Sequence, residues 1–81
     1  MKEKFRLADA GNVLPPIYYL LVENGFEVSL SGERWTAENS EVILSSEDLV
    51  ALTGMVYLYQ NKGENWRVTD DQIDSFVQKY S

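Results

Sequence analysis

The run between Asp48 and Lys62 carries no charge, and it limits the folds open to this chain more than any other feature. If Leu49–Tyr59 is helical, its apolar side chains cover two opposite sides of the helix. One side would hold Leu49, Leu52, Val56 and Tyr59, and the other Ala51, Met55 and Leu58. Eleven residues are too few to cross a bilayer, which takes about 20. We therefore expect a helix buried at the centre of a small domain, or one wall of an interface.

Length and composition indicate one globular domain over residues 1–81. A chain of 81 residues is too short for two cores, and 44% apolar with 25% charged residues is ordinary for a folded protein. There is no cysteine, so disulfides and thiol chemistry are excluded. The charged start at Lys2–Arg6 is not followed by the apolar run of a signal peptide. We therefore expect a cytoplasmic protein that neither enters nor binds a membrane.

The acidity of the chain is concentrated in its middle third. The net charge is −6, and residues 23–48 alone hold seven acidic side chains against Arg34. These acids are interpreted either as solvated surface or as a docking face for a basic partner.

The first third of the chain predicts one helix. Residues 2–8 fit either a short strand or a helical turn, and residues 9–12 resemble a loop. Pro15 and Pro16 are tolerated in the first turn of a helix, and Asn24-Gly25 is a typical helix end. We expect a helix over residues 15–23.

Alternating apolar and polar residues then predict strands. Residues 26–37 read as a β-hairpin that turns at Ser31-Gly32, and residues 42–44 read as a third short strand. The expected core side of the hairpin consists of Phe26, Val28, Leu30, Trp35 and Ala37.

Two further helices are expected after the strands. Ser45 or Ser46 would cap a helix over residues 47–60 that ends at Gly63. Alternatively, Gly54 ends it early and residues 55–60 and 66–69 pair as a hairpin. A capping box at Thr69 and Gln72 predicts the last helix, whose core stripe is Ile73, Phe76, Val77 and Tyr80. Gly54 would permit close approach of another backbone, either that of the first helix or that of a second copy of the chain.

The predicted fold class is therefore α+β. It consists of an N-terminal helix, a small antiparallel β-hairpin or three-stranded sheet, and two C-terminal helices packed on one sheet face.

The residues that usually carry chemistry are missing or poorly placed. The chain has no histidine or cysteine, so the usual general bases and nucleophiles are lost. The adjacent acids Asp70-Asp71 and Glu47-Asp48 point about 100° apart on a helix, which suits helix N-termini better than a shared substrate. We expect no catalytic residue, metal or cofactor. An acidic last helix would repel phosphate, so direct nucleic-acid binding is not expected either.

The preferred function is a non-catalytic protein-interaction module that binds another protein or forms a weak homodimer. The candidate interface is an apolar surface with an acidic rim. It consists of Tyr18, Tyr19, Tyr57 and Tyr59, with Glu27, Glu33 and Glu38 as the rim. The alternative is an acidic protein that sequesters a basic, nucleic-acid-binding partner. A small enzyme that uses only carboxylates ranks third.

Overall fold

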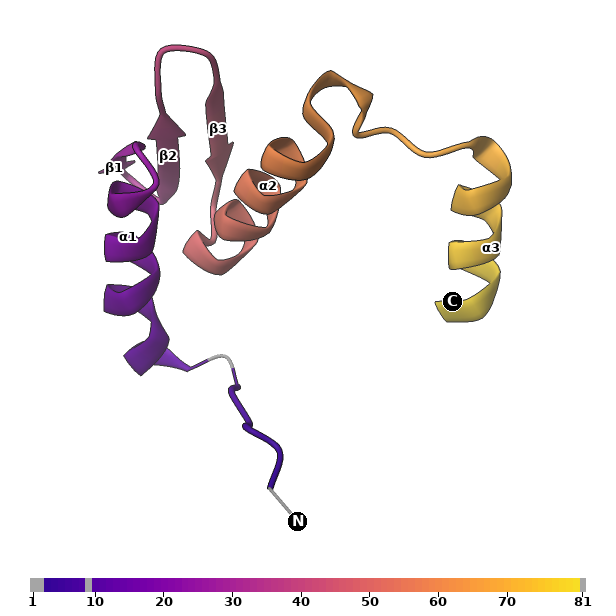
Figure 1. The fold of residues 1–81 in the computed structure, drawn as a ribbon, viewed down its shortest axis with the longest axis horizontal. Coiled ribbons are helices and arrows are strands. Elements are labelled where there is room, and N and C mark those ends of the chain that lie inside the picture. The colour runs from indigo at the N-terminus through magenta and orange to yellow at the C-terminus, as the bar shows by residue number, and fades with distance from the viewer. Residues whose placement is uncertain (1–2, 9, 81) are drawn as a thin grey trace.

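The expected α+β fold class and the order of its elements are confirmed by a computed structural model, which describes residues 3–8 and 10–80 (Figure 1). A helix comes first, a three-stranded sheet follows, and two helices end the chain. The helices are α1 (Leu14–Glu23), α2 (Leu49–Lys62) and α3 (Asp70–Tyr80), with short 3₁₀ helices η1 (Gly11–Val13) and η2 (Gly63–Asn65). The strands are β1 (Glu27–Ser31), β2 (Arg34–Glu38) and β3 (Ile43–Ser46).

The sheet is an antiparallel meander in the order β1-β2-β3. Val28 pairs with Ala37, and Ala37 pairs with Leu44, so these three side chains share one face of the sheet. The helices α1 and α2 pack against this face. The opposite face carries the alternate, mostly polar residues and is open to solvent.

Both ends of α1 follow from local sequence signals. Pro15 and Pro16 lie in its first turn, where the missing N–H groups cost nothing. At its other end the side-chain amide of Asn24 donates a hydrogen bond to the carbonyl oxygen of Leu20 at 2.7 Å. Gly25 then takes φ +88°, a left-handed conformation that favours glycine. The chain thereby reverses direction into β1.

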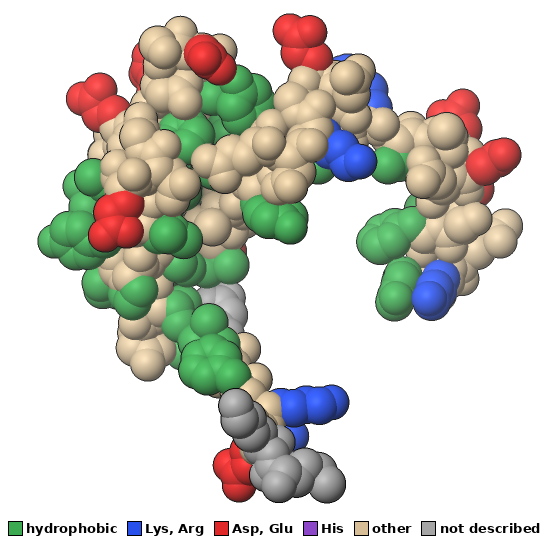
Figure 2. Space-filling model, in the orientation of Figure 1, with side chains coloured by type: hydrophobic (Ala, Val, Ile, Leu, Met, Phe, Trp, Pro, Cys, Tyr) green, Lys and Arg blue, Asp and Glu red, His purple; other side chains and the backbone are tan. Residues whose placement is uncertain are grey.

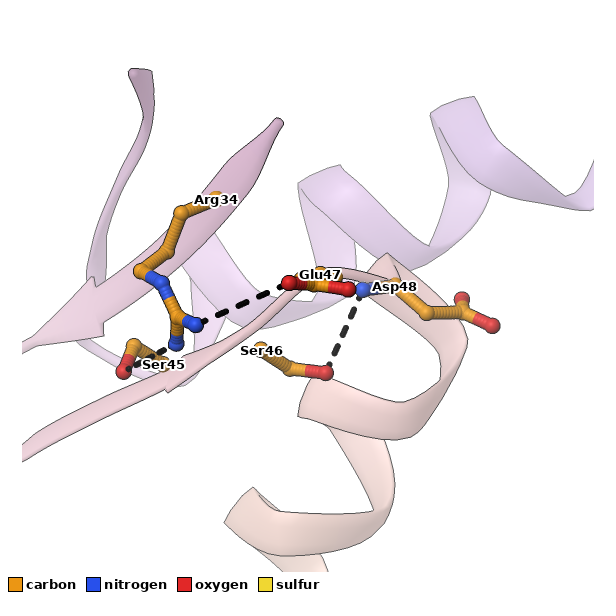
Figure 3. Close-up of polar contacts among 5 residues, drawn as sticks. All are labelled: Arg34, Ser45, Ser46, Glu47 and Asp48. Atoms are coloured by element: carbon orange, nitrogen blue, oxygen red, sulfur yellow. Dashed lines mark hydrogen bonds and ion pairs between the residues drawn. The ribbon is translucent and has the colours of Figure 1, made fainter. Parts of the chain in front are cut away.

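The joint between β3 and α2 is held by polar contacts (Figure 3). Arg34 donates to the Ser45 hydroxyl at 3.3 Å and lies 3.9 Å from the Glu47 carboxylate. The hydroxyl of Ser46 accepts from the backbone N–H of Asp48 at 3.2 Å. Asp48, which accepts from the N–H of Val50 at 2.8 Å, is therefore the N-cap. The prediction that Ser45 or Ser46 caps α2 is wrong, because Ser46 stabilises the preceding turn instead.

The long form of α2 is the one observed, and the alternative hairpin over residues 55–69 is wrong. The helix continues to Lys62 and stops at Gly63, whose φ is +55°. Gly54 lies within it, and a Cβ at this position would have nothing within 4 Å. The expected close approach of α1 at Gly54 is therefore not observed.

The core is small and lies between α1, α2 and the sheet. Its buried members are Leu21, Phe26, Ala37, Leu49, Leu52 and Val56. Only one side of α2 is buried, whereas Met55 and Leu58 on its other side are exposed. Leu30, which was expected in the core, is 53% exposed, because it lies on an edge strand next to the turn at Gly32. The uncharged helix is thus half covered rather than buried all round.

The last helix does not pack on the sheet, which corrects the predicted arrangement. None of its residues is buried, and α3 stands apart from α1, α2 and the strands (Figure 1). The radius of gyration over Cα atoms is 15.3 Å, against about 12 Å for a compact domain of this length. The linker over residues 66–69, which has no regular secondary structure, separates α3 from the core (Figure 1).

The N-terminal segment is neither the strand nor the helical turn that was expected. Residues 3–8 have no regular structure, and η1 occupies part of the expected loop. The predictions for Lys2 and Asp9 lie outside the described residues.

Candidate functional site

The exposed side of α2 forms a groove with the sheet and with the segment that follows the helix. This α2 groove has a volume of about 550 Å³. Its apolar lining consists of Val42, Leu44, Met55, Leu58 and Trp66, and its remaining residues are Glu41, Tyr59, Gly63 and Glu64. Leu44 belongs to β3, while Met55 and Leu58 belong to the exposed stripe of α2. The groove exists because the core covers only the opposite side of that helix.

The polar edge of the α2 groove is acidic. The hydroxyl of Tyr59 donates a hydrogen bond to the Glu41 carboxylate at 3.1 Å. Partial burial raises the pKa of the Tyr59 phenol, and the hydrogen bond to Glu41 and the charges of Glu41 and Glu64 raise it further. Deprotonation of Tyr59 would place a phenolate beside two carboxylates. This edge of the groove therefore favours the neutral phenol, or a bound cation, over a further negative charge.

The amphipathic helix α3 presents a second apolar surface. This α3 stripe consists of Ile73, Phe76, Val77 and Tyr80, all of them exposed. Phe76 is 65% exposed and its ring centroid lies 5.3 Å from that of Tyr80. The apolar side chains of α3 face back across open space toward the rest of the molecule, while acidic groups lie on its outer side (Figure 2). The stripe was predicted from its spacing, but as part of the core.

The four candidate tyrosines do not form one surface. Tyr18 and Tyr19 are neighbours, with ring centroids 5.1 Å apart in an edge-to-face arrangement, and Tyr18 packs partly on the core. Tyr59 lies in the α2 groove. Tyr57, which is 70% exposed, points to nearly the opposite side of the same helix because two residues turn about 200°. Tyr19 and Tyr57 are therefore the more exposed members of the set.

The three candidate glutamates are all exposed but are divided between two ends of the hairpin. Glu27 and Glu38 are directly opposite one another in the β1–β2 register, on the open face of the sheet. Glu33 lies in the turn at the other end. The only ion pair among the described residues joins Arg34 to Glu47, so no cation of this part of the chain compensates the Glu27–Glu38 pair.

A second hollow of about 490 Å³ lies beside α1. Leu7 and Ala8 form one wall, Ile17 and Leu20 of α1 form another, and Val50 of α2 closes it. Its lining is mostly apolar, with Asn12 as a polar member. Like the α2 groove, it can take apolar side chains but offers few polar groups to orient a small ligand.

No cluster of three potential metal ligands occurs among the residues that the structure describes. Over the same residues, every ionisable side chain is exposed or half-buried, so none is held in an apolar environment of the kind that activates a base.

The α2 groove was missed by the sequence reasoning, although one signal was present. Met55 and Leu58 were placed on the side of α2 opposite Leu52, but Val42, Leu44 and Trp66 reach them only through the tertiary fold. The pairing of these residues depends on how β3 turns into α2.

Comparison of the chain with protein-family models, with curated proteins and with solved structures found no match. In the described part of the chain, no helix combines the length and apolar character needed to span a membrane.

Proposed function

We propose that this protein is a non-catalytic interaction module that binds another protein or a second copy of itself through apolar side chains. The observation that carries the proposal is the α3 stripe, which has no partner within the described chain. An amphipathic helix normally buries such a stripe, and helix-in-groove contact is a common form of recognition. The α2 groove and the exposed Tyr19 and Tyr57 add further apolar contact area.

Sedimentation velocity over a concentration series tests this proposal. We expect the wild type to associate, and Phe76→Glu to weaken the association because it places a charge in the α3 stripe. Ser75→Glu is the matched control, since Ser75 lies on the polar side of the same helix. Tyr57→Glu tests whether the exposed side chain of Tyr57 takes part in the association.

A different partner is tested with the same variants in cell extract. A specific partner should be retained by the wild type and by Ser75→Glu but lost from Phe76→Glu. If the wild type stays monomeric at all concentrations and retains nothing that Phe76→Glu loses, the proposal fails.

The second candidate function is sequestration of a basic, nucleic-acid-binding protein. The specific observation in its favour is the Glu27–Glu38 pair, because like charges directly opposite in a sheet repel one another. A cationic partner would relieve this repulsion. Binding should then fall steeply with salt, and the double variant Glu27→Gln, Glu38→Gln should abolish it. Retention of basic proteins that is equal for the double variant and the wild type would contradict this function.

A further inference from the structure

We propose that α3 of one copy docks in the α2 groove of a second copy, and that the second copy returns the same contact. This inference rests on the proposed function and names the partner as another copy of the chain. It joins two of the apolar surfaces that the fold leaves without a partner, the α3 stripe and the α2 groove.

The helix α3 needs its apolar stripe to be buried if it is to remain helical. Helices shorter than about 12–15 residues are marginal in water by themselves, and α3 has 11 residues. Its capping box and the Phe76–Tyr80 contact help, but they leave the α3 stripe in solvent. Docking in an apolar groove supplies the missing burial.

The linker favours another copy over the same chain. Trp66 is itself part of the groove wall, so its own α3 would have to turn back within Arg67–Thr69. That segment leads away from α2 without regular secondary structure (Figure 1), contains β-branched Val68 and Thr69, and has no glycine or proline for a tight turn. When two copies exchange their α3 helices, each helix can reach the other copy's groove without a reversal of the chain at this linker.

The buried area matches a reciprocal exchange. Large aromatic side chains bury roughly 150–250 Å² each, so covering the α3 stripe removes on the order of 400 Å² of helix surface. The groove contributes a similar area. A two-fold pair contains the contact twice and buries on the order of 1,600 Å², the size of a standard specific interface, whereas a single contact falls in the range of crystal packing.

Charge sets the direction of α3 in the groove. Glu41 and Glu64 are part of the groove lining, and Lys79, near the C-terminal end of α3, is the only cation of that helix. The aspartates of α3 all precede Ser75. The favoured orientation therefore brings Lys79 toward the glutamates and keeps the aspartates away from them.

The absence of cysteine allows a direct test with the full-length chain. A Leu58→Cys chain, whose thiol lies in the α2 groove, is mixed with a Val77→Cys chain, whose thiol lies in the α3 stripe. A short bismaleimide is then added to cross-link thiols that lie close together. Both positions are exposed, so both variants should fold. The matched control mixes Leu58→Cys with Ser75→Cys, on the polar side of α3. Because docked thiols face one another at millimolar effective concentration, mixed dimers should form roughly tenfold faster than in the control.

Three outcomes would overturn the exchange. The first is mixed-dimer formation no faster than in the control. The second is a double variant, Leu58→Cys with Val77→Cys, that cross-links only within one chain, which would mean that α3 folds back. The third is a wild type that stays monomeric throughout. If association depends on Phe76 but the mixed dimer does not form, the exchange fails and the proposed function stands.

Charge variants test the orientation. Lys79→Glu should raise the dimer dissociation constant roughly two- to thirtyfold, because the dimer contains this exposed ion pair twice. Adding Glu64→Lys should reverse the loss. A loss without this reversal would overturn the orientation.

Discussion

Leu52 is a fully buried side chain at the centre of the core, where α2 meets the sheet. Truncation there leaves a cavity that few neighbours can fill. Leu52→Ala should lower the free energy of unfolding by about 2–5 kcal/mol, which is much of the stability of so small a domain. Urea denaturation followed by circular dichroism measures the loss.

The control for Leu52 is Leu20→Ala, which shortens a half-exposed side chain in α1. It should cost less than about 1 kcal/mol, since surface changes have small effects. A loss below about 1 kcal/mol for Leu52→Ala would show that α2 does not bury this side.

The raised pKa of Tyr59 predicts that the folded protein loses stability at alkaline pH. Its folded-state pKa is raised above the usual 10.0, so the folded protein holds this proton more tightly than the unfolded chain does. The resulting stabilisation is fully present below about pH 10 and disappears as the pH rises through the folded-state pKa. Unfolding free energies between pH 8 and 11 should therefore fall more steeply for the wild type than for Tyr59→Phe. Parallel curves would contradict the raised pKa.

At the scale of elements, the capping box of α3 acts on a helix without tertiary support. The Thr69 hydroxyl accepts from the N–H of Gln72 at 3.2 Å, and the Gln72 side chain accepts from the N–H of Thr69 at 2.9 Å. Thr69→Ala should cost α3 about 1 kcal/mol, while Thr69→Ser should be nearly neutral.

Because α3 is separate from the core, the effect of Thr69→Ala should be local in a dilute sample. Amide exchange over residues 70–80 should accelerate while the melting temperature of the core stays unchanged. Unchanged exchange in α3 would mean that the helix begins elsewhere. A lower core melting temperature would mean that α3 is coupled to the core.

Elements with local signals were predictable from sequence. Pro15, Gly25, Gly63 and the Thr69–Gln72 box each mark a helix end through their own backbone chemistry, and the structure places helix ends at each. The start of α2 was missed by a few residues, because several polar residues in a row compete for the cap and only geometry selects Asp48.

Packing was less predictable than the elements. The spacing of apolar residues in α3 indicates that one face of the helix will be covered, but it does not indicate what covers it. The α3 stripe was therefore assigned to a core that it does not join. Leu30 fits the alternation of apolar and polar residues in β1, but it is exposed because β1 lies at the edge of the sheet. The candidate tyrosines were grouped by residue type, whereas helical geometry separates Tyr57 from Tyr59.

At the scale of the whole molecule, the detached helix predicts an expanded monomer. Small-angle X-ray scattering extrapolated to low concentration should give a radius of gyration near the 15.3 Å of the Cα trace, rather than about 12 Å for a compact chain. A value near 12 Å would mean that α3 folds back on its own core in solution. Particle mass measured in the same series separates expansion from dimerisation.

The meander order of the sheet bears on how quickly the chain reaches its native state. Each strand pairs with its neighbour in sequence, so the loops that must close are short and their entropic cost is low. The packing of α1 against α2 is the main contact between distant segments. Domains rich in such local contacts fold faster than domains of the same size that are built from distant strand pairings. Little time is then available for the open edges of β1 and β3 to pair with another unfolded chain.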